Sequence, residues 1–264
     1  MFTKQRFNIV FGYLRLVVIK LKLKTKYYLA QKNLVVNHNN YLIRYHNDGD
    51  DQELLYLANW AKYFEEEYPI LNKLINSGDV VVDVGANLGF FSIIISKIVG
   101  EKGNVFSFEP SINIFSKLID NLKLNSITNV NLENCGLGKS DEILTLKRNK
   151  KYSGMSTLVL EQDNEIIEEQ VKITSLDKYF FDKVIKIDLI KIDTEGFEPE
   201  VLIGAKKIIT SYKPVIYIEL GGGKFLKSSG RAIKILNDYG YKLPIKEDDL
   251  ESIPAGRNFV ALPK

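Results

Sequence analysis

Short apolar runs alternate with longer segments of helical spacing over most of the chain. The runs have the length of buried strands and lie at 80–84, 104–108, 129–133, 187–192 and 215–219. Apolar residues recur with helical spacing at 89–98, 111–124, 199–209 and 231–239, and closing strands are predicted near 241–245 and 257–262. Strands that alternate with helices predict an α/β fold with a doubly wound, mostly parallel sheet.

Other segments flank or interrupt this alternation. Residues 52–75 have a helical pattern broken near Pro69, and residues 31–47 alternate apolar and polar positions around Tyr41 to Tyr45, as a strand does. Strands at 142–148 and 170–174 predict an inserted β segment around a polar loop, 149–169. Four aromatic residues of the helical pattern could roof a ligand pocket or belong to the core: Tyr56, Trp60, Tyr63 and Phe64. We divide the chain into an arm, 1–30, a cap, 31–78, and a main domain, 79–264.

Residues 2–29 predict an amphipathic helix with a basic face. Residues 1–47 hold nine Lys and Arg and no Asp or Glu, whereas the remainder holds 27 Lys and Arg against 33 Asp and Glu. That acidic remainder argues against nucleic-acid binding. The apolar run from Phe7 to Ile19 contains Arg15 and is too short to cross a bilayer. We predict a cytoplasmic protein whose arm lies at the inner face of the membrane, or against the core or a second subunit.

The reactive side chains exclude several classes of catalytic site. The chain has one cysteine, Cys135, and two histidines, His38 and His46, which both precede the main domain. An internal disulfide, a cysteine-rich zinc site and a histidine-based triad in the main domain are therefore excluded. Carboxylates, hydroxyls, amides, lysine and tyrosine remain for chemistry.

The segment VVVDVGANLGFFS, residues 80–92, joins a buried strand to a helix through a glycine-bearing turn. Such a turn forms a nucleotide pocket in α/β folds, because Gly85 lets the backbone approach a ligand and Asn87 can cap the helix. Asn87 stands where the dinucleotide fingerprint has its second glycine, which makes room for a pyrophosphate. The turn therefore favours a ligand without a pyrophosphate.

A carboxylate follows the next strand, about 20 residues past the turn. Glu109, followed by Pro110, is placed to accept hydrogen bonds from both hydroxyls of a ribose, and it would repel a 2′-phosphate. S-adenosylmethionine (SAM) fits this pocket, because it carries a sulfonium and an amino acid in place of phosphates.

The segment IDLIKIDTEGFEPEVLIGAKKII, residues 187–209, adds a third motif. Together with DVGANLGFFS and FEP it closely resembles the FkbM family of SAM-dependent methyltransferases, over about residues 78–220. The resemblance implies a Rossmann-like class I methyltransferase fold and methylation of a hydroxyl oxygen, often on a sugar or a polyketide. We accordingly expect a glycan, lipid-linked or not, or a related small molecule as acceptor.

Within this resemblance, the residues of the first strands are expected to hold the cofactor. Gly85, Asn87 and Gly89 would shape the turn around the methionine part of SAM, and Asp83 would orient that turn or accept from the amino group. Glu109 with Pro110 would hold the ribose. Asn134 and Cys135, after the third strand, would lie near the adenine.

The later strand ends are expected to serve the acceptor. Asp193 is the candidate base and Glu195 the alternative, since a carboxylate within hydrogen-bond reach can accept the proton of the alcohol. Glu219, and Ser153 and Ser156 of the inserted segment, are candidate acceptor contacts. Asp193, Glu195 and Glu219 could instead hold a divalent ion such as Mg²⁺, although none is expected. An NAD-dependent oxidoreductase and a non-catalytic methyltransferase-like binding protein are the alternatives.

Overall fold

A computed structural model describes residues 35–44, 46, 51–149, 152–157, 166–183, 186–253 and 256–264. Residues 2–29, on which the amphipathic-helix and membrane predictions rest, lie outside these ranges. So do the side chains of Tyr56, Trp60 and Tyr63. Within the described residues, no helix is both long enough and apolar enough to cross a membrane.

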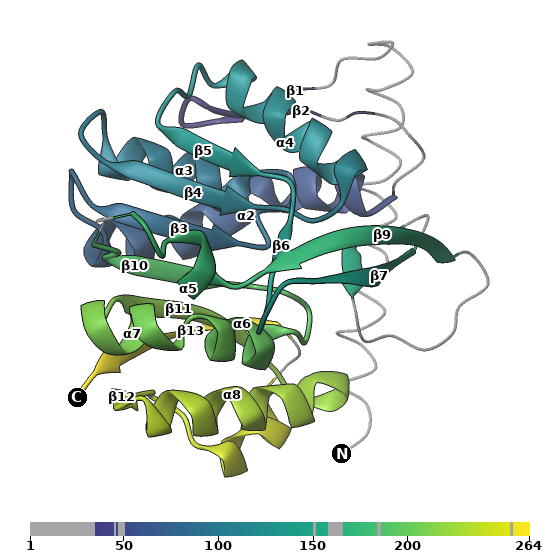
Figure 1. Cartoon of the computed structure of the whole chain (residues 1–264). Coiled ribbons are helices and arrows are strands. Elements are labelled where there is room, and N and C mark those ends of the chain that lie inside the picture. Colours follow the sequence, from purple (N-terminus) through teal and green to yellow (C-terminus); the bar gives the residue numbers. More distant parts are fainter. Residues whose placement is uncertain are drawn as a thin grey trace, which may run out of the picture.

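The core is a seven-stranded sheet in the order β12–β13–β11–β10–β3–β4–β5 (Figure 1). Its strands are β3 (Val80–Val84), β4 (Asn104–Phe108), β5 (Val130–Glu133), β10 (Leu189–Ile192), β11 (Val215–Leu220), β12 (Tyr241–Lys242) and β13 (Arg257–Pro263). The strands from β5 to β11 run parallel, and β13 is antiparallel to β11. The predicted doubly wound, mostly parallel sheet is confirmed.

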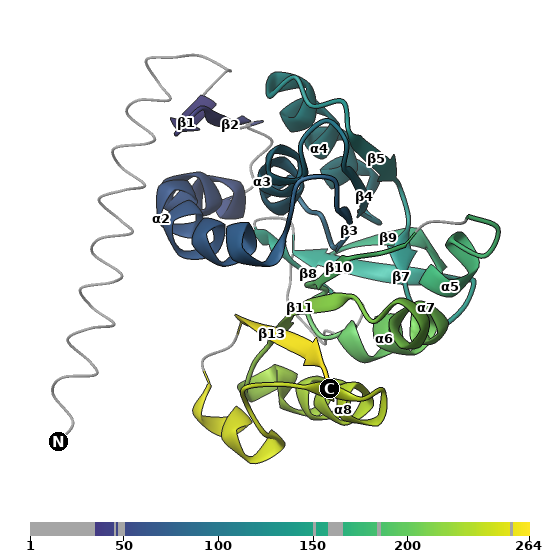
Figure 2. The same cartoon turned by 90° about the vertical axis from the view of Figure 1, so that its left-hand side faces the viewer.

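Helices cover both faces of this sheet, as Figure 2 shows. One face carries α2 (Asp51–Leu74), α3 (Phe90–Val99) and α4 (Ile112–Leu124), and the other carries α5 (Leu176–Tyr179), α6 (Glu198–Gly204), α7 (Lys206–Tyr212) and α8 (Leu226–Asp238). Successive residues of a strand point to opposite faces. Val81 accordingly packs with α2 and α3, and Val82 packs on the other side. Burial on both faces is why these strands read as continuous apolar runs.

A second, four-stranded sheet projects from the core. It has the order β6–β9–β7–β8, from β6 (Gly136–Leu137), β7 (Glu142–Asn149), β8 (Tyr152–Thr157) and β9 (Ile166–Thr174). The inserted β segment is therefore present. The prediction of a polar loop over 149–169 was wrong in part, because β8 lies within it and pairs antiparallel with β7.

Several predicted boundaries were wrong for tertiary reasons. The helix predicted at 199–209 is two helices, α6 and α7, and the Asp177 carboxylate accepts from Lys207 N and Ile208 N at the start of α7. Helix α2 continues through Pro69, which is exposed, so the carbonyl that loses its partner can face water. The predicted N-terminal strand is a hairpin of β1 (Val35–His38) and β2 (Tyr41–Arg44), closed by Asn39 and Asn40 at positive φ.

The remaining boundary differences lie near the C-terminus. Helix α8 begins at Leu226, five residues before the predicted start, after a short 3₁₀ turn, η1 (Gly223–Phe225). Strand β12 is only two residues long, and a second 3₁₀ segment, η2 (Glu247–Ser252), precedes β13.

The strand order reverses at β3, because the chain passes from β3 to β4 on one side and later returns to β10 on the other. In open α/β sheets, ligands bind beyond the carboxyl ends of the strands at such a reversal. The carboxyl ends of β3 and β10 are therefore where the fold places a binding site.

Candidate functional site

A cavity of about 680 Å³ opens at this reversal. That volume lies within the usual range for small-molecule and cofactor sites. The β3–α3 turn, the end of β4, the loop after β10 and helix α2 all contribute to its wall. Polar side chains reach it from these elements and from β11 and β13: Glu66, Glu67, Asn87, Glu109, Lys191, Asp193, Thr194, Glu195, Tyr217, Glu219, Arg257 and Asn258.

The β3–α3 turn is shaped by backbone crowding as well as by the cavity. Gly85 has a φ of +74°, and a Cβ on it would lie 1.9 Å from the backbone oxygen of Asp193. Gly89 is the N-cap residue of α3, at a φ of +93°, and a Cβ there would lie 2.6 Å from Leu118. The prediction that Asn87 caps the helix was wrong. Asn87 instead occupies the left-handed region (φ +51°) inside the turn, where asparagine is tolerated.

Glu109 lies at the carboxyl end of β4 and is almost fully buried. Its Oε2 accepts from Asn87 N at 3.0 Å and its Oε1 accepts from Ser111 N at 2.9 Å. Burial raises the pKa of Glu109 to about 7, against the effect of these two hydrogen bonds. Each carboxylate oxygen keeps a lone pair for a further donor. Glu109 thus ties the turn to β4 and still borders the cavity.

Asn134 and Cys135, the predicted adenine contacts, do not line the cavity. Asn134 Nδ2 donates to the carbonyl oxygens of Glu109, at 2.9 Å, and Pro110, at 3.1 Å. Cys135 packs against the core, and burial raises the pKa of its thiol to about 11. Pro110 and Gly136 border the cavity, whereas Asn134 and Cys135 are not among the residues that line it.

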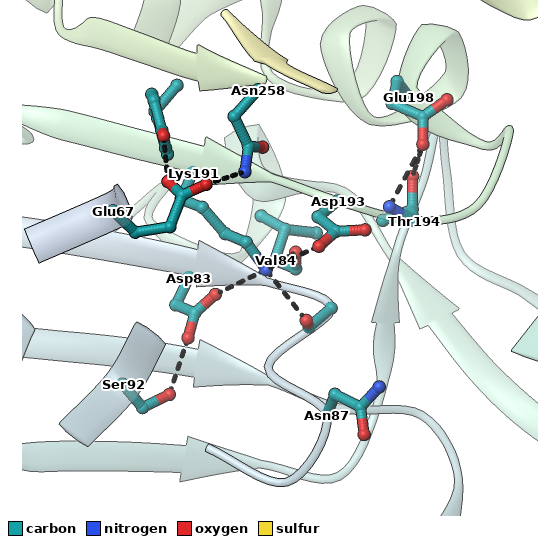
Figure 3. A network of polar contacts seen from close by, with 12 residues as sticks. Glu67, Asp83, Val84, Asn87, Ser92, Lys191, Asp193, Thr194, Glu198 and Asn258 are labelled. Atoms are coloured by element: carbon teal, nitrogen blue, oxygen red, sulfur yellow. Dashed lines mark hydrogen bonds and ion pairs between the residues drawn. The ribbon is translucent and has the colours of Figure 1, made fainter. Parts of the chain in front are cut away.

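A buried chain of polar contacts runs from β4 to the loop after β10, and Figure 3 shows its part from Ser92 to Asp193. Ser107 Oγ lies 2.8 Å from Ser92 Oγ, which donates to Asp83 Oδ2 at 2.6 Å. Asp83 Oδ1 pairs with Lys191 Nζ at 3.2 Å, and Lys191 Nζ lies 3.6 Å from Asp193 Oδ2. Asp83 is fully buried. Its carboxylate is held by Ser92 and Lys191. The sequence analysis did not identify Lys191 as a residue of the site.

Three carboxyl groups meet at the ends of β10 and β11. Oxygen atoms of Asp193, Glu195 and Glu219 all lie within 4.8 Å of one another, a grouping that could also surround a cation. The negative charge of Asp193, followed by burial and a hydrogen bond to Asp193, raises the pKa of Glu219 well above its ordinary value. Burial, followed by the charge of Asp193, raises the pKa of Glu195 to about 7. The charge of Asp193 and burial thus both favour the neutral form of Glu219.

Glu198, at the start of α6, holds the loop that carries these acids. Its buried Oε1 accepts from Thr194 N at 3.1 Å, Thr194 Oγ1 at 2.9 Å and Gly196 N at 3.0 Å. Glu195 is left at a φ of +54°. Sequence reasoning missed this role, although a glutamate at the first turn of a helix is a known signal for capping.

Helix α2 reaches the cavity through Glu66, Glu67 and Ile70. The Glu67 carboxylate accepts from the hydroxyl of Tyr217 on β11 and from Asn258 Nδ2 on β13, at 3.2 Å for the latter (Figure 3). Of the aromatic residues proposed as a roof, Phe64 is buried in the core beside Tyr41. Ser153 and Ser156 belong to β8, and their side chains lie outside the described residues.

Comparison with known proteins places the chain among methyltransferases. The model of the methyltransferase FkbM domain matches residues 83–243. The chain is 31% identical over 167 residues to methyltransferase sdnD of Sordaria araneosa, covering 52% of this chain and 63% of that protein. It is 28% identical over 143 residues to Methyltransferase 1 of Beauveria bassiana, covering 47% of this chain and 57% of that protein. The matches thus span less than two thirds of either relative's length.

The solved structures include a methyltransferase FkbM from Methylobacillus flagellatus KT. It superposes with a TM-score of 0.49 at 17% identity, over 81% of this chain and 55% of that one. The family model spans the β3–α3 turn, the end of β4 and the acidic loop after β10, which form much of the cavity wall. The chain therefore belongs to the FkbM methyltransferase family.

Proposed function

We propose that the protein is a SAM-dependent methyltransferase that methylates a hydroxyl group of a sugar or a related polyhydroxylated molecule. The observation that carries the proposal is the meeting of two groups of residues in one cavity. The Gly85–Asn87 turn and Glu109 form its cofactor side, and Asp193 and Glu219 line the same cavity.

SAM would place its amino-acid part against the β3–α3 turn and its ribose hydroxyls on Glu109. In methyl transfer the acceptor oxygen forms a bond to the methyl carbon as the carbon–sulfur bond breaks. The electron pair of that bond goes to sulfur, and the proton of the alcohol goes to Asp193. The enzyme contributes chiefly by aligning the two reactants and by supplying the base.

The charge of the cavity favours a neutral acceptor. Its wall holds the carboxyl groups of Glu66, Glu67, Glu109, Asp193, Glu195 and Glu219, against the cations Lys191 and Arg257. A phosphate or carboxylate near the reacting hydroxyl would meet like charge, whereas sugar hydroxyls can donate hydrogen bonds to these oxygens. The same wall argues against NAD, because its pyrophosphate carries two negative charges.

Calorimetric titration with SAM and with NAD tests the cofactor. SAM binding without NAD binding is expected, and the reverse would establish the oxidoreductase alternative. Incubation with a panel of neutral sugars and glycans then tests transfer, read by mass spectrometry as a gain of about 14 daltons, the mass of a methylene. Binding of SAM with no transfer to any acceptor class would favour a non-catalytic role.

Asp193→Asn tests the base. The substitution keeps the shape of the side chain and should lower turnover by about 10²–10⁴-fold while SAM affinity stays within a few fold. Glu66→Gln is the matched control, because it removes an acid of the same cavity that belongs to α2 and lies outside the cluster. Equal turnover in Asp193→Asn and Glu66→Gln would move the role of base to another group.

A further inference from the structure

Lys191 is a buried cation that stands between polar residues of the two neighbouring strands. It is 1% exposed and lies in β10, in register with Asp83 of β3 on one side and Tyr217 of β11 on the other. A buried ammonium is costly unless each of its three N–H donors finds an acceptor. The contacts of Lys191 must therefore account for a charged side chain within the apolar strand LIKI.

Those contacts reach beyond a single ion pair. Lys191 Nζ donates to the carbonyl oxygen of Gly85 at 3.0 Å, and it lies 3.2 Å from Asp83 Oδ1 and 3.6 Å from Asp193 Oδ2. Its ammonium also lies 4.7 Å from the centre of the Phe91 ring, at the start of α3. The lysine thus touches the cofactor turn, the helix that follows the turn and the carboxylate of the acceptor side. Figure 3 shows the ammonium between them.

Asp83, the partner of Lys191, is itself held in place by side chains of the core. Asp83 is fixed by Ser92 on α3, which is in turn 2.8 Å from Ser107 on β4. The contact with Asp83 uses one of the three N–H donors of the ammonium. The bond to Gly85 O and the approach to Asp193 place the same cation where the two halves of the site meet.

We propose that Lys191 is a positioning residue, which holds the turn around the amino-acid part of SAM and the carboxylate of Asp193 as one rigid unit. The inference rests on the proposed function. Without the ammonium, Gly85 O loses its donor, and Asp83 and Asp193 face each other with no cation between them. The turn would then lose its position relative to Asp193, while the ribose contact at Glu109, on the far side of the turn, would persist.

Binding measurements with three probes test this role without knowledge of the acceptor. SAM and S-adenosylhomocysteine carry the amino-acid part, whereas methylthioadenosine has the nucleoside and the sulfur but lacks that part. Lys191→Met should weaken binding of the first two by about 10- to 100-fold, as expected for a lost charge-assisted contact. Binding of methylthioadenosine should change by less than about threefold. Lys117→Met, which replaces another buried lysine on α4, is the matched control and should leave all three affinities unchanged.

A second variant separates positioning from folding. Lys191→Met alone leaves Asp83 as an uncompensated buried charge and could unfold the protein. The double variant Asp83→Asn, Lys191→Met removes both charges and should recover stability toward urea while SAM binding stays weak. Recovery of SAM affinity together with stability would overturn the inference, as would an equal loss for all three probes. Failure of the unaltered protein to bind SAM would overturn the proposed cofactor and this inference together.

Discussion

Replacing Gly85 by alanine probes the closest backbone approach at the site. The added Cβ would lie 1.9 Å from the carbonyl oxygen of Asp193, which belongs to backbone and cannot rotate away as a side chain could. The φ of +74° adds the strain of a left-handed conformation. Both effects act on the contact between the β3–α3 turn and the loop after β10.

Gly78→Ala is the control that separates the two effects. Gly78 has a φ of +94°, and a Cβ added there would meet nothing within 4 Å. Its substitution should cost only the conformational strain, about 1–2 kcal/mol of unfolding free energy. Gly85→Ala should cost that amount plus about 1–3 kcal/mol for overpacking, giving a total of about 2–5 kcal/mol.

Urea unfolding followed by circular dichroism measures both losses under the same conditions. SAM titration of the folded Gly85→Ala protein supplies a second readout, because displacement of the turn should weaken cofactor binding, whereas Gly78→Ala should not. If Gly85→Ala loses no more stability than Gly78→Ala, the turn can relax around the new methyl group and the argument from close approach is refuted.

Two further substitutions test the cavity wall by their effect on stability. Because burial raises the pKa of Glu109 from 4.5 to about 7, the folded protein holds a proton that the unfolded chain releases, and stability should fall as pH rises between these values. The contribution of Glu109 to the slope approaches about 1.4 kcal/mol per pH unit, and Glu109→Gln should remove this contribution while that of Glu195 remains. An unchanged slope of stability against pH in urea unfolding from pH 5 to 8 would contradict this assignment. Tyr217→Phe removes the hydroxyl that donates to Glu67 and should cost about 1.5–3 kcal/mol. Tyr241→Phe, which loses only a bond to a backbone carbonyl, should cost about 0.5–1.5 kcal/mol, and equal losses in thermal unfolding would show that Glu67 does not hold α2 to the sheet.

The alternation of strands and helices and the place of the site at the strand ends follow from local patterns. Runs such as VVVDV and NVFSF have the length and composition of buried strands, and a glycine turn between such a strand and an apolar helix marks the strand end where a ligand is expected. The spacing of apolar residues reflects the conformation of a few neighbouring residues, so it can be interpreted without knowledge of the fold. It failed at α6 and α7, where the end of one helix is decided by a distant carboxylate, Asp177.

The partners of the polar side chains were decided only by tertiary structure. Gly85 was singled out from the sequence for its closeness to a ligand, whereas the structure shows that the Asp193 backbone itself requires the glycine. Asp83 and Lys191 are 108 positions apart, and Glu67 and Asn258 are 191 positions apart, yet each pair is in contact. The register of the sheet and the packing of α2 across the strand ends bring these residues together. Neither can be recognised from the pattern of neighbouring residues in the sequence. The sequence by itself thus determined most strands and helices of the main sheet and which of its strands end in a carboxylate. The tertiary structure decided which of them cluster together, which are paired with Lys191 and which face the cavity, because those properties depend on distances that only the assembled sheet defines.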